Sequence, residues 1–263
     1  MTRRPTLMIF SDLDGTLLDH ETYDWSPAAP ALAALAEMGA PVVLASSKTA
    51  PEIARLRAAM GLSHWPAIVE NGAGLLPPER DDAPDCADHA RLRAALETLP
   101  EALRASFEGF TDMDAARVAE VTGLPPEDAA RARTRAFSEP GLWHGDDATR
   151  AAFIDALDAQ GIAAVMGGRF LTLSHGADKA DRLRELAQAY EPAQTVALGD
   201  APNDIGMLSA ADHGVVIANP ASPEIPALPG EDAGRVTRTV DTGPLGWNSA
   251  ILSLLDQLTL TES

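Results

Sequence analysis

The sequence predicts an α/β fold: a doubly wound parallel sheet with a smaller α+β cap domain inserted into it. Short apolar runs recur along the chain, and each ends abruptly in polar residues, as the strands of a buried parallel sheet do. Helical patterns separate these runs, which is the alternation expected of parallel strands. A proline- and acid-rich connector interrupts the alternation from Pro77. We therefore expect a first core segment over residues 1–82, an inserted cap over 83–168 and a second core segment over 169–263.

The first apolar run, Leu7–Phe10, predicts a buried strand that ends in two aspartates one residue apart. Gly15 follows them and allows the chain to turn sharply, so Asp12 and Asp14 can face one small site around a cation. Such a pair suits covalent phosphoryl transfer. Asp12 would attack phosphorus, and Asp14 would give a proton to the leaving oxygen and later take one from water. The alternative is that this motif is only a surface turn after a strand.

The next two apolar runs bring polar residues to the same edge of the sheet. A helix over residues 26–38 is followed by an apolar run at 41–49, a second helix to residue 60 and another apolar run at 66–74. The polar residues at the ends of these runs, which we expect to bind substrate, are Ser46, Ser47, Lys48 and Asn71. Ser46 is placed to donate a hydrogen bond to a phosphoryl oxygen. The alternative is that the serines satisfy the loop backbone.

The predicted cap is mostly helical and rich in arginine. Helical stretches are expected over residues 87–99, 112–121, 126–135 and 147–160. Nine of the 18 arginines lie between Arg91 and Arg169, and no lysine does.

The core resumes with a strand at residues 170–174 and a helix that begins near Lys179. A cation is disfavoured at a helix N-terminus, and the chain has only two lysines among 20 basic residues. This placement suggests that Lys179 faces nearby anions and that a compact ammonium is needed there. A solvated lysine on a helix face is the alternative.

A last core strand, near residues 195–199, ends in Asp200. Asp200 can complete an oxygen-only site with Asp12 and the main-chain carbonyl of Asp14, and such a site favours Mg²⁺. We expect Asp204 behind this site, where it would orient Asn203, Lys179 or a metal-bound water. Two edge strands at 213–220 and 235–241 and a helix over 244–258 complete the chain.

Charge and cysteine content restrict the function further. A net charge of −19 and a pI near 4.5, with no block of basic residues, argue against binding to nucleic acid or to an anionic membrane surface. Cys86 is the single cysteine, and nothing near it suggests a metal cluster or an activated thiol. The apolar run near the N-terminus is too short for a signal peptide, so we expect a cytoplasmic protein.

Four motifs, taken in order, resemble those of the haloacid dehalogenase-like phosphatases. They are DLDGT, the SSKT strand end, Lys179 and GDAPND. The long insertion before Lys179 implies the cap of the Cof-type subgroup. By this resemblance Asp12 is the nucleophile, Asp14 the general acid and base, and Ser46 and Lys179 bind the phosphoryl group. Mg²⁺ would bind to Asp12, Asp14 and Asp200.

A narrower resemblance, in both core and cap, is to mannosyl-3-phosphoglycerate phosphatases. The strings that carry it include LLDHETYDW, FSEPGLW and GGRFLTLSHGADKA. It implies a phosphorylated glycosyl glycerate as substrate, mannosyl or glucosyl. We expect Ser138, Glu139 and Arg169 to select it, with Arg169 holding the carboxylate as a bidentate pair. Arg169 as a surface residue near a hinge is the alternative. Residues 101–135 match no string of this family.

The sequence is also compatible with other functions. A phosphomutase, or a phosphatase for another sugar phosphate, would share the core chemistry. A phospho-accepting regulatory domain also uses an aspartate beside Mg²⁺, but it needs neither an inserted cap nor an acid and base two residues after the nucleophile. An inactive sugar-phosphate binding protein is a third possibility. We expect a monomer or a weak homodimer.

Overall fold

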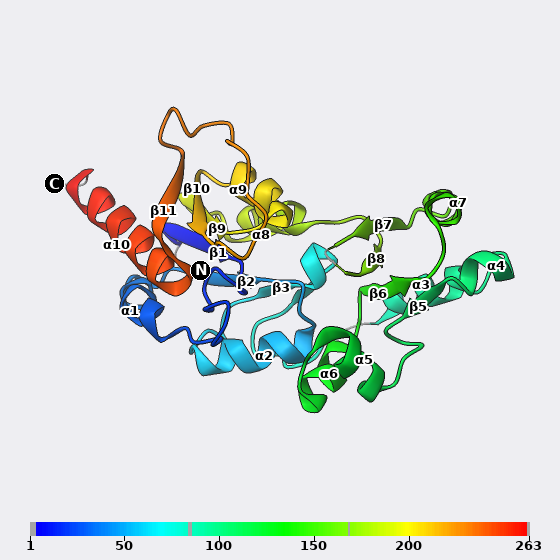
Figure 1. Ribbon diagram of the computed structural model, residues 1–263. Coiled ribbons are helices and arrows are strands. Elements are labelled where there is room, and N and C mark those ends of the chain that lie inside the picture. Colours follow the sequence, from blue (N-terminus) through cyan, green and yellow to red (C-terminus); the bar gives the residue numbers. More distant parts are fainter. Residues whose placement is uncertain (1–3, 84–85, 168, 262–263) are drawn as a thin grey trace. The chain divides into compact units, whose positions relative to one another are not determined.

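The structure, a computed structural model, describes residues 4–83, 86–167 and 169–261 (Figure 1). The chain divides into two compact units. The first unit comprises Met1–Ser46, Trp65–Ile68 and Asp178–Ser263, and the second comprises Ser47–His64 and Val69–Ala177. Each unit is thus built from segments that are separate in the sequence. The predicted boundary at residue 168 lies outside the described residues, and the boundaries as a whole stay predictions.

Most of the predicted core strands belong to one seven-stranded sheet. Its order is β11 (Val236–Thr242), β10 (His213–Ala218), β9 (Gln194–Gly199), β1 (Leu7–Ser11), β2 (Val42–Ala45), β3 (Ala67–Val69) and β4 (Gly74–Leu76). The strand β1 pairs in parallel with β2 on one side and with β9 on the other. All five of its residues are fully buried, because an apolar strand at the centre of a parallel sheet is covered on both faces.

One strand prediction is wrong. The sequence predicts an edge strand at residues 213–220, but β10 lies between β9 and β11 and pairs in parallel with both. Its apolar residues Val215–Ile217 are buried, as in an interior strand. The edge strand on this side of the sheet is β11, and most of its residues are exposed.

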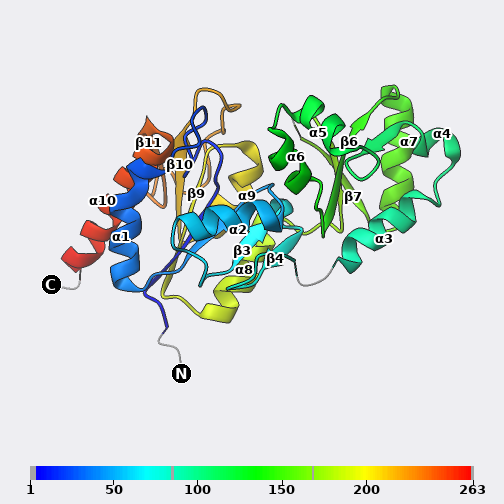
Figure 2. The same cartoon turned by 90° about the horizontal axis from the view of Figure 1, so that it is seen from below.

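The first unit contains helices that the sequence predicts, and the last of them begins one residue before and ends three residues after its predicted range of 244–258. They are η1 (Ser26–Ala28), α1 (Ala29–Met38), α8 (Lys179–Tyr190), η3 (Pro202–Asp204), α9 (Ile205–Ala210) and α10 (Gly243–Thr261). The helix α1 ends at Gly39, whose φ of 67° is the left-handed conformation of a helix C-cap. Figures 1 and 2 show α1 and α10 side by side. No helix within the described ranges is both long and apolar enough to cross a membrane.

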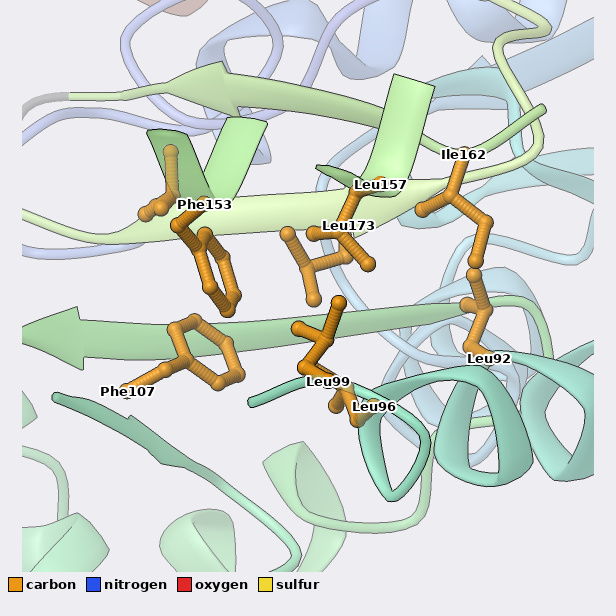
Figure 3. Close-up of a cluster of buried hydrophobic side chains, with 9 residues drawn as sticks. Leu92, Leu96, Leu99, Phe107, Phe153, Leu157, Ile162 and Leu173 are labelled. Carbon is orange, nitrogen blue, oxygen red and sulfur yellow. The ribbon is translucent and has the colours of Figure 1, made fainter. Parts of the chain in front are cut away.

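The second unit has its own antiparallel sheet and its own core. The sheet order is β5 (Phe107–Gly109), β6 (Ser138–Trp143), β8 (Leu171–Ser174) and β7 (Ala163–Met166). The helices of this unit are α2 (Ala50–Ala59), α3 (Ala87–Leu96), α4 (Glu101–Arg104), α5 (Ala115–Thr122), α6 (Pro126–Ala132) and α7 (Asp147–Asp158), with a short η2 (Glu70–Gly72). Leucines of α3 and α7 pack with Phe107, Phe153 and Leu173 in one cluster (Figure 3). The α/β fold with an antiparallel second domain is therefore confirmed.

Candidate active site

The predicted nucleophile lies at the carboxyl end of the central strand. The Asp12 N–H donates to the Leu198 carbonyl of β9 at 2.9 Å, which continues the sheet pairing one residue beyond β1. The chain then turns at Gly15, where φ is 83° and the N–H donates to the Leu18 carbonyl. A side chain at Gly15 would also collide with Asn219, whose Nδ2 lies 2.2 Å from the position of a Cβ. The sharp turn after the aspartates is confirmed.

Lys179 is the first residue of α8 and is paired with two aspartates. Its Nζ lies 2.5 Å from Asp12 Oδ1 and 2.8 Å from Asp204 Oδ1, and the lysine is 2% exposed. The Asp178 side chain caps the helix by accepting from the Asp181 N–H, so the start of α8 is fixed. The expectation that this lysine faces anions is borne out by these two ion pairs.

The ionisation of these groups follows from their burial and mutual contact. Burial alone would lower the pKa of Lys179, but the carboxylates of Asp12 and Asp204 outweigh it and raise that pKa above its ordinary value. Lys179 is therefore a permanent cation at neutral pH. The pKa of Asp12 is raised because the carboxylate is desolvated and because Asp204 and Asp200 repel it, although Lys179 opposes this shift. The site carries more negative charge than one ammonium neutralises.

Asp204 is buried behind the pair because its neighbour is a glycine. Its Oδ2 accepts hydrogen bonds from the N–H groups of Asp200 and Ala201, and the residue is fully buried. A Cβ on Gly199 would lie 2.5 Å from the Cβ of Asp204, so this packing requires glycine at the end of β9. With Oδ1 on Lys179 and Oδ2 on the backbone, Asp204 holds the lysine in place.

Asp200, which follows β9, is held by three side-chain donors that the sequence-based predictions do not include. The hydroxyl of Thr16 donates to Oδ1 at 2.6 Å. The Asn219 amide and the Ser222 hydroxyl donate to Oδ2 at 2.8 and 2.7 Å. Thr16 stands in the DLDGT string itself, and Asn219 directly follows the parallel strand β10, so position at a strand end is the sequence feature by which they are recognisable.

The residues present fit a divalent metal ion. Oxygens of Asp12, Asp200 and Asp204 lie within 4.8 Å of one another, and all three residues are buried. Buried carboxylates at this spacing repel unless a cation lies among them, and an oxygen-only donor set suits a hard cation. Asp14 is half-buried and follows two residues after Asp12, and its predicted contribution through the main-chain carbonyl stays a prediction.

The remaining predicted residues lie in both units. Ser46 is buried at the end of β2 and its N–H donates to the Ile68 carbonyl, and Asn203 lies exposed in η3. In the second unit the carbonyls of Ser47 and Lys48 accept from Arg135 and from the Glu70 N–H. Asn71 has a left-handed φ of 58°. The roles of these residues in substrate binding stay predictions.

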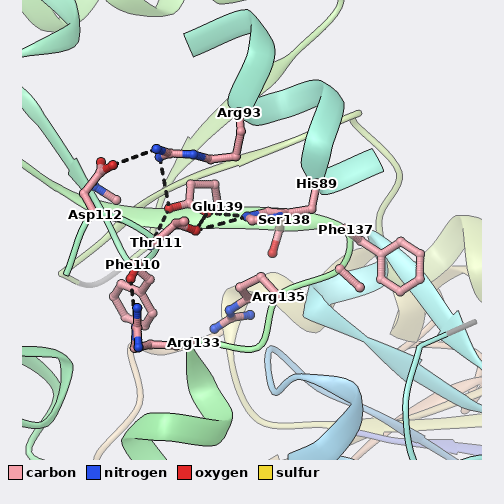
Figure 4. A network of polar contacts seen from close by, with 12 residues as sticks. His89, Arg93, Phe110, Thr111, Asp112, Arg133, Arg135, Phe137, Ser138 and Glu139 are labelled. Carbon is pink, nitrogen blue, oxygen red and sulfur yellow. Dashed lines mark hydrogen bonds and ion pairs between the residues drawn. The ribbon is translucent and has the colours of Figure 1, made fainter. Parts of the chain in front are cut away.

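Three residues predicted to select the substrate have protein partners in the second unit. The Ser138 hydroxyl donates to Glu70 at 2.6 Å. Glu139 is fully buried and contacts His89 and Thr111 (Figure 4). The Arg169 guanidinium donates to the carbonyls at the end of α5, those of Val121 and Thr122. To bind substrate, these groups would have to exchange or share the partners described, and their selecting role stays a prediction.

Comparison with known structures agrees with this fold. A haloacid dehalogenase-like hydrolase from Bacteroides thetaiotaomicron has a TM-score of 0.66 at 20% identity, covering 94% of this chain and 98% of its own. A phosphatase of the haloalkanoate (HAD) superfamily from the same organism has a TM-score of 0.61 at 20% identity, covering 97% and 96%. A sucrose-phosphatase from Synechocystis, in complex with sucrose and phosphate, has a TM-score of 0.60 at 15% identity, covering 94% and 97%. These similarities concern the fold.

The sequence also matches a family model. The model described as haloacid dehalogenase-like hydrolase matches residues 9–85 and 151–228, which together are more than half of the chain. The matched segments contain Asp12, Lys179 and Asp200, the residues that the structure brings to one edge of the sheet. The chain therefore belongs to the family of haloacid dehalogenase-like hydrolases.

Proposed function

We propose that the chain is a Mg²⁺-dependent phosphatase that hydrolyses a small phosphorylated substrate through an aspartyl-phosphate on Asp12. The contact of 2.5 Å between Lys179 Nζ and Asp12 Oδ1 carries this proposal. A desolvated carboxylate is a stronger nucleophile than a hydrated one, and a fixed ammonium beside it counters the charge of an incoming phosphoryl group. Both features serve phosphoryl transfer.

In the proposed reaction the chain's own residues make and break the bonds in two steps. Asp12 attacks phosphorus, the bond from phosphorus to the ester oxygen breaks, and Asp14 protonates the leaving oxygen. Asp14 then takes a proton from water, whose oxygen attacks phosphorus and releases phosphate and the free Asp12 carboxylate. Lys179 keeps its proton throughout, because the two aspartates raise its pKa.

Mg²⁺ would be held by Asp12, Asp200 and the main-chain carbonyl of Asp14, with Asp204 beside them. When bound, the cation supplies electrostatic stabilisation of the charge on the transferring phosphoryl group. Mg²⁺ is preferred over softer metals because the available donors are carboxylate oxygens.

For the substrate we propose mannosyl-3-phosphoglycerate, with the glucosyl compound as a close alternative. The sequence strings shared with mannosyl-3-phosphoglycerate phosphatases support this choice, and they lie in both the core and the predicted cap. The products would be the glycosylglycerate and phosphate. With a single cysteine and no disulfide to form, the enzyme is proposed to act in the cytoplasm, as a monomer or a weak homodimer.

The test is phosphate release by the purified protein with Mg²⁺. The panel holds both glycosyl-3-phosphoglycerates, 3-phosphoglycerate, mannose 6-phosphate, sucrose phosphate and an aryl phosphate. We expect kcat/KM for the glycosyl-phosphoglycerates to exceed the others by at least about a hundredfold, because polar groups in a specific site are left unsatisfied by a truncated substrate. Equal, slow turnover of the whole panel would exclude this substrate and keep the phosphatase.

Substitution of the nucleophile tests the chemistry separately from the substrate. Asp12→Asn should fold and yet release no phosphate, because an amide is not a nucleophile at neutral pH. Recovery of substantial activity in the purified variant would exclude Asp12 as the nucleophile.

A phosphatase for another sugar phosphate is the second candidate, favoured by the similarity in fold to the sucrose-phosphatase. Preferential turnover of sucrose phosphate or mannose 6-phosphate would support it. An isomerised phosphate in place of free phosphate would indicate a phosphomutase. Long-lived phosphorylation of Asp12 without turnover would indicate a regulatory domain.

A further inference from the structure

The loop that follows β10 is organised around one carboxylate. Asn219 Nδ2 donates to Asp200 Oδ2 at 2.8 Å, and the Ser222 hydroxyl donates to the same oxygen at 2.7 Å. The Asn219 Oδ1 accepts from the Ala221 N–H at 3.0 Å, which fixes the orientation of the amide, since the atom that accepts must be the oxygen. Both side chains of this loop therefore present donors to Asp200.

The number of donors limits what Asp200 can offer to a metal ion. An ionised carboxylate has about four lone-pair positions, two on each oxygen. Asn219 and Ser222 use both positions on Oδ2, and Thr16 uses one on Oδ1. One position on Oδ1 remains for a cation.

Packing keeps this arrangement from relaxing. Asp200 is 4% exposed and Thr16 is fully buried. The Asn219 amide lies against Gly15, where a Cβ would approach Nδ2 to 2.2 Å, so it occupies space that only a glycine leaves. The amide is thus held between the turn after Asp14 and the carboxylate.

From these contacts we infer that Asn219 and Ser222 are positioning residues that restrict Asp200 to ligation through one oxygen, Oδ1, and thereby favour Mg²⁺ over Ca²⁺. Mg²⁺ takes six ligands in strict octahedral geometry, whereas Ca²⁺ takes six to eight and commonly binds carboxylates through both oxygens. Saturation of Oδ2 disfavours the two-oxygen mode. This inference rests on the proposed metal-dependent function and adds the basis of metal selectivity to it.

The test is calorimetric titration of the full-length, metal-free protein with Mg²⁺ and, separately, with Ca²⁺. The variants are Ser222→Ala and the double variant Asn219→Leu with Ser222→Ala. We expect Mg²⁺ affinity to fall by at least about tenfold in the double variant, as for other residues that orient metal ligands. Ca²⁺ affinity should fall less or rise, because Oδ2 becomes available, so the ratio of Mg²⁺ to Ca²⁺ affinity should fall at least about tenfold.

Two controls separate orientation from packing. Ser222→Thr keeps the hydroxyl donor and should keep the wild-type affinity ratio. Ser253→Ala, on an exposed part of α10, should change neither affinity. If the double variant does not fold, Ser222→Ala alone is used, because it removes only one hydroxyl. Thermal unfolding without metal shows whether this single variant folds. Equal loss of affinity for both cations, or no change in the ratio, would overturn the inference.

The same measurements distinguish this inference from the proposed function. If wild-type protein binds Mg²⁺ with the expected selectivity but releases no phosphate from any substrate, the phosphatase proposal is wrong and the positioning role stands. If wild-type protein binds neither cation, the positioning role is overturned.

Discussion

At the scale of single residues, the site depends on two glycines as much as on its charged groups. Gly199 leaves the space that Asp204 fills, and Gly15 leaves the space that Asn219 fills. The charged groups are close because these two positions lack a side chain. Loss of either glycine therefore acts on the carboxylates without removing any of them.

Gly15→Ala should abolish most phosphate release and destabilise the protein. The φ of 83° strains any residue with a Cβ by about 1 kcal/mol, and the new methyl would displace the Asn219 amide. The matched control is Gly39→Ala, where φ is 67° but no atom lies within 4 Å of a Cβ. It should lose about the same 1 kcal/mol and keep its activity. Denaturant unfolding measures the stability of the two variants, and phosphate release measures their activity. Equal activity in the two variants would contradict the prediction.

At the scale of elements, the last helix is hydrogen-bonded to the strand that leads into Asp12. Trp247 in α10 is fully buried, and its Nε1 donates to the Ser11 hydroxyl at 2.9 Å. That hydroxyl donates in turn to the Asp12 carbonyl at 2.7 Å. The end of β1 is thus fixed from a helix more than two hundred residues later in the chain.

Trp247→Phe should lower the free energy of unfolding by about 1 to 3 kcal/mol, because it removes one buried hydrogen bond and part of the ring volume. Phosphate release should fall as well, since the Ser11 hydroxyl loses one of its two partners. Trp25→Phe, at a half-buried tryptophan before η1, is the control and should change both quantities much less. Similar effects of the two substitutions would argue against a specific role for α10.

In the second unit, one aspartate joins three elements. Asp112, after β5, accepts from Arg93 of α3 at 2.7 Å (Figure 4). It also accepts from Arg104 of α4 at 2.9 Å and from the Gly109 N–H at 3.0 Å. Burial alone would raise the pKa of Asp112, but these hydrogen bonds outweigh it and lower that pKa below its ordinary value. The stabilisation is therefore present above the pKa of the unfolded chain and is lost as the pH falls through the pKa of the folded protein.

Asp112→Asn should destabilise the protein by about 2 kcal/mol at neutral pH, because it removes charge-assisted hydrogen bonds. The difference from wild type should shrink as the pH falls, since the wild-type carboxylate is then protonated too. Denaturant unfolding followed by circular dichroism at several pH values measures this. Asp147→Asn, at an exposed aspartate paired with Arg150, should have almost no effect at any pH. A difference that persists undiminished in acid would contradict the assignment.

At the scale of the whole molecule, the protein has a large excess of negative charge. The net charge of −19 makes the folded chain repel itself, and salt screens this repulsion. We expect the melting temperature of the metal-free protein to rise between low and physiological ionic strength. The measurement is thermal unfolding in a chelator with increasing potassium chloride, and a melting temperature that falls with salt would contradict it.

How much of this structure the sequence predicts depends on how far apart in the sequence the contacting residues lie. Asp12 and Asp200 are predictable because residues at the ends of parallel strands meet at one edge of the sheet. Lys179 is predictable because a cation is disfavoured in the first turn of a helix unless anions lie beside it. Asn219 has the same signal as the two aspartates, because it directly follows β10, whereas Ser222 has none, because its contact with Asp200 is set by the path of a loop. The same reason applies to Glu139, which contacts His89 and Thr111. These residues lie 50 and 28 positions earlier in the sequence, so the contacts form only when the second unit is folded. The interior position of β10 likewise depends on where β11 pairs.

The burial of Lys179 has a practical consequence for chemical labelling. The chain has only two lysines, and Lys179 is 2% exposed and bonded to two carboxylates, whereas Lys48 is half-buried. An amine-reactive reagent can acylate Lys179 only during moments when the start of α8 opens, so the rate of that acylation measures the opening. Mass spectrometry distinguishes the two lysines, so the acylation rate of Lys179 reports how often this end of α8 opens.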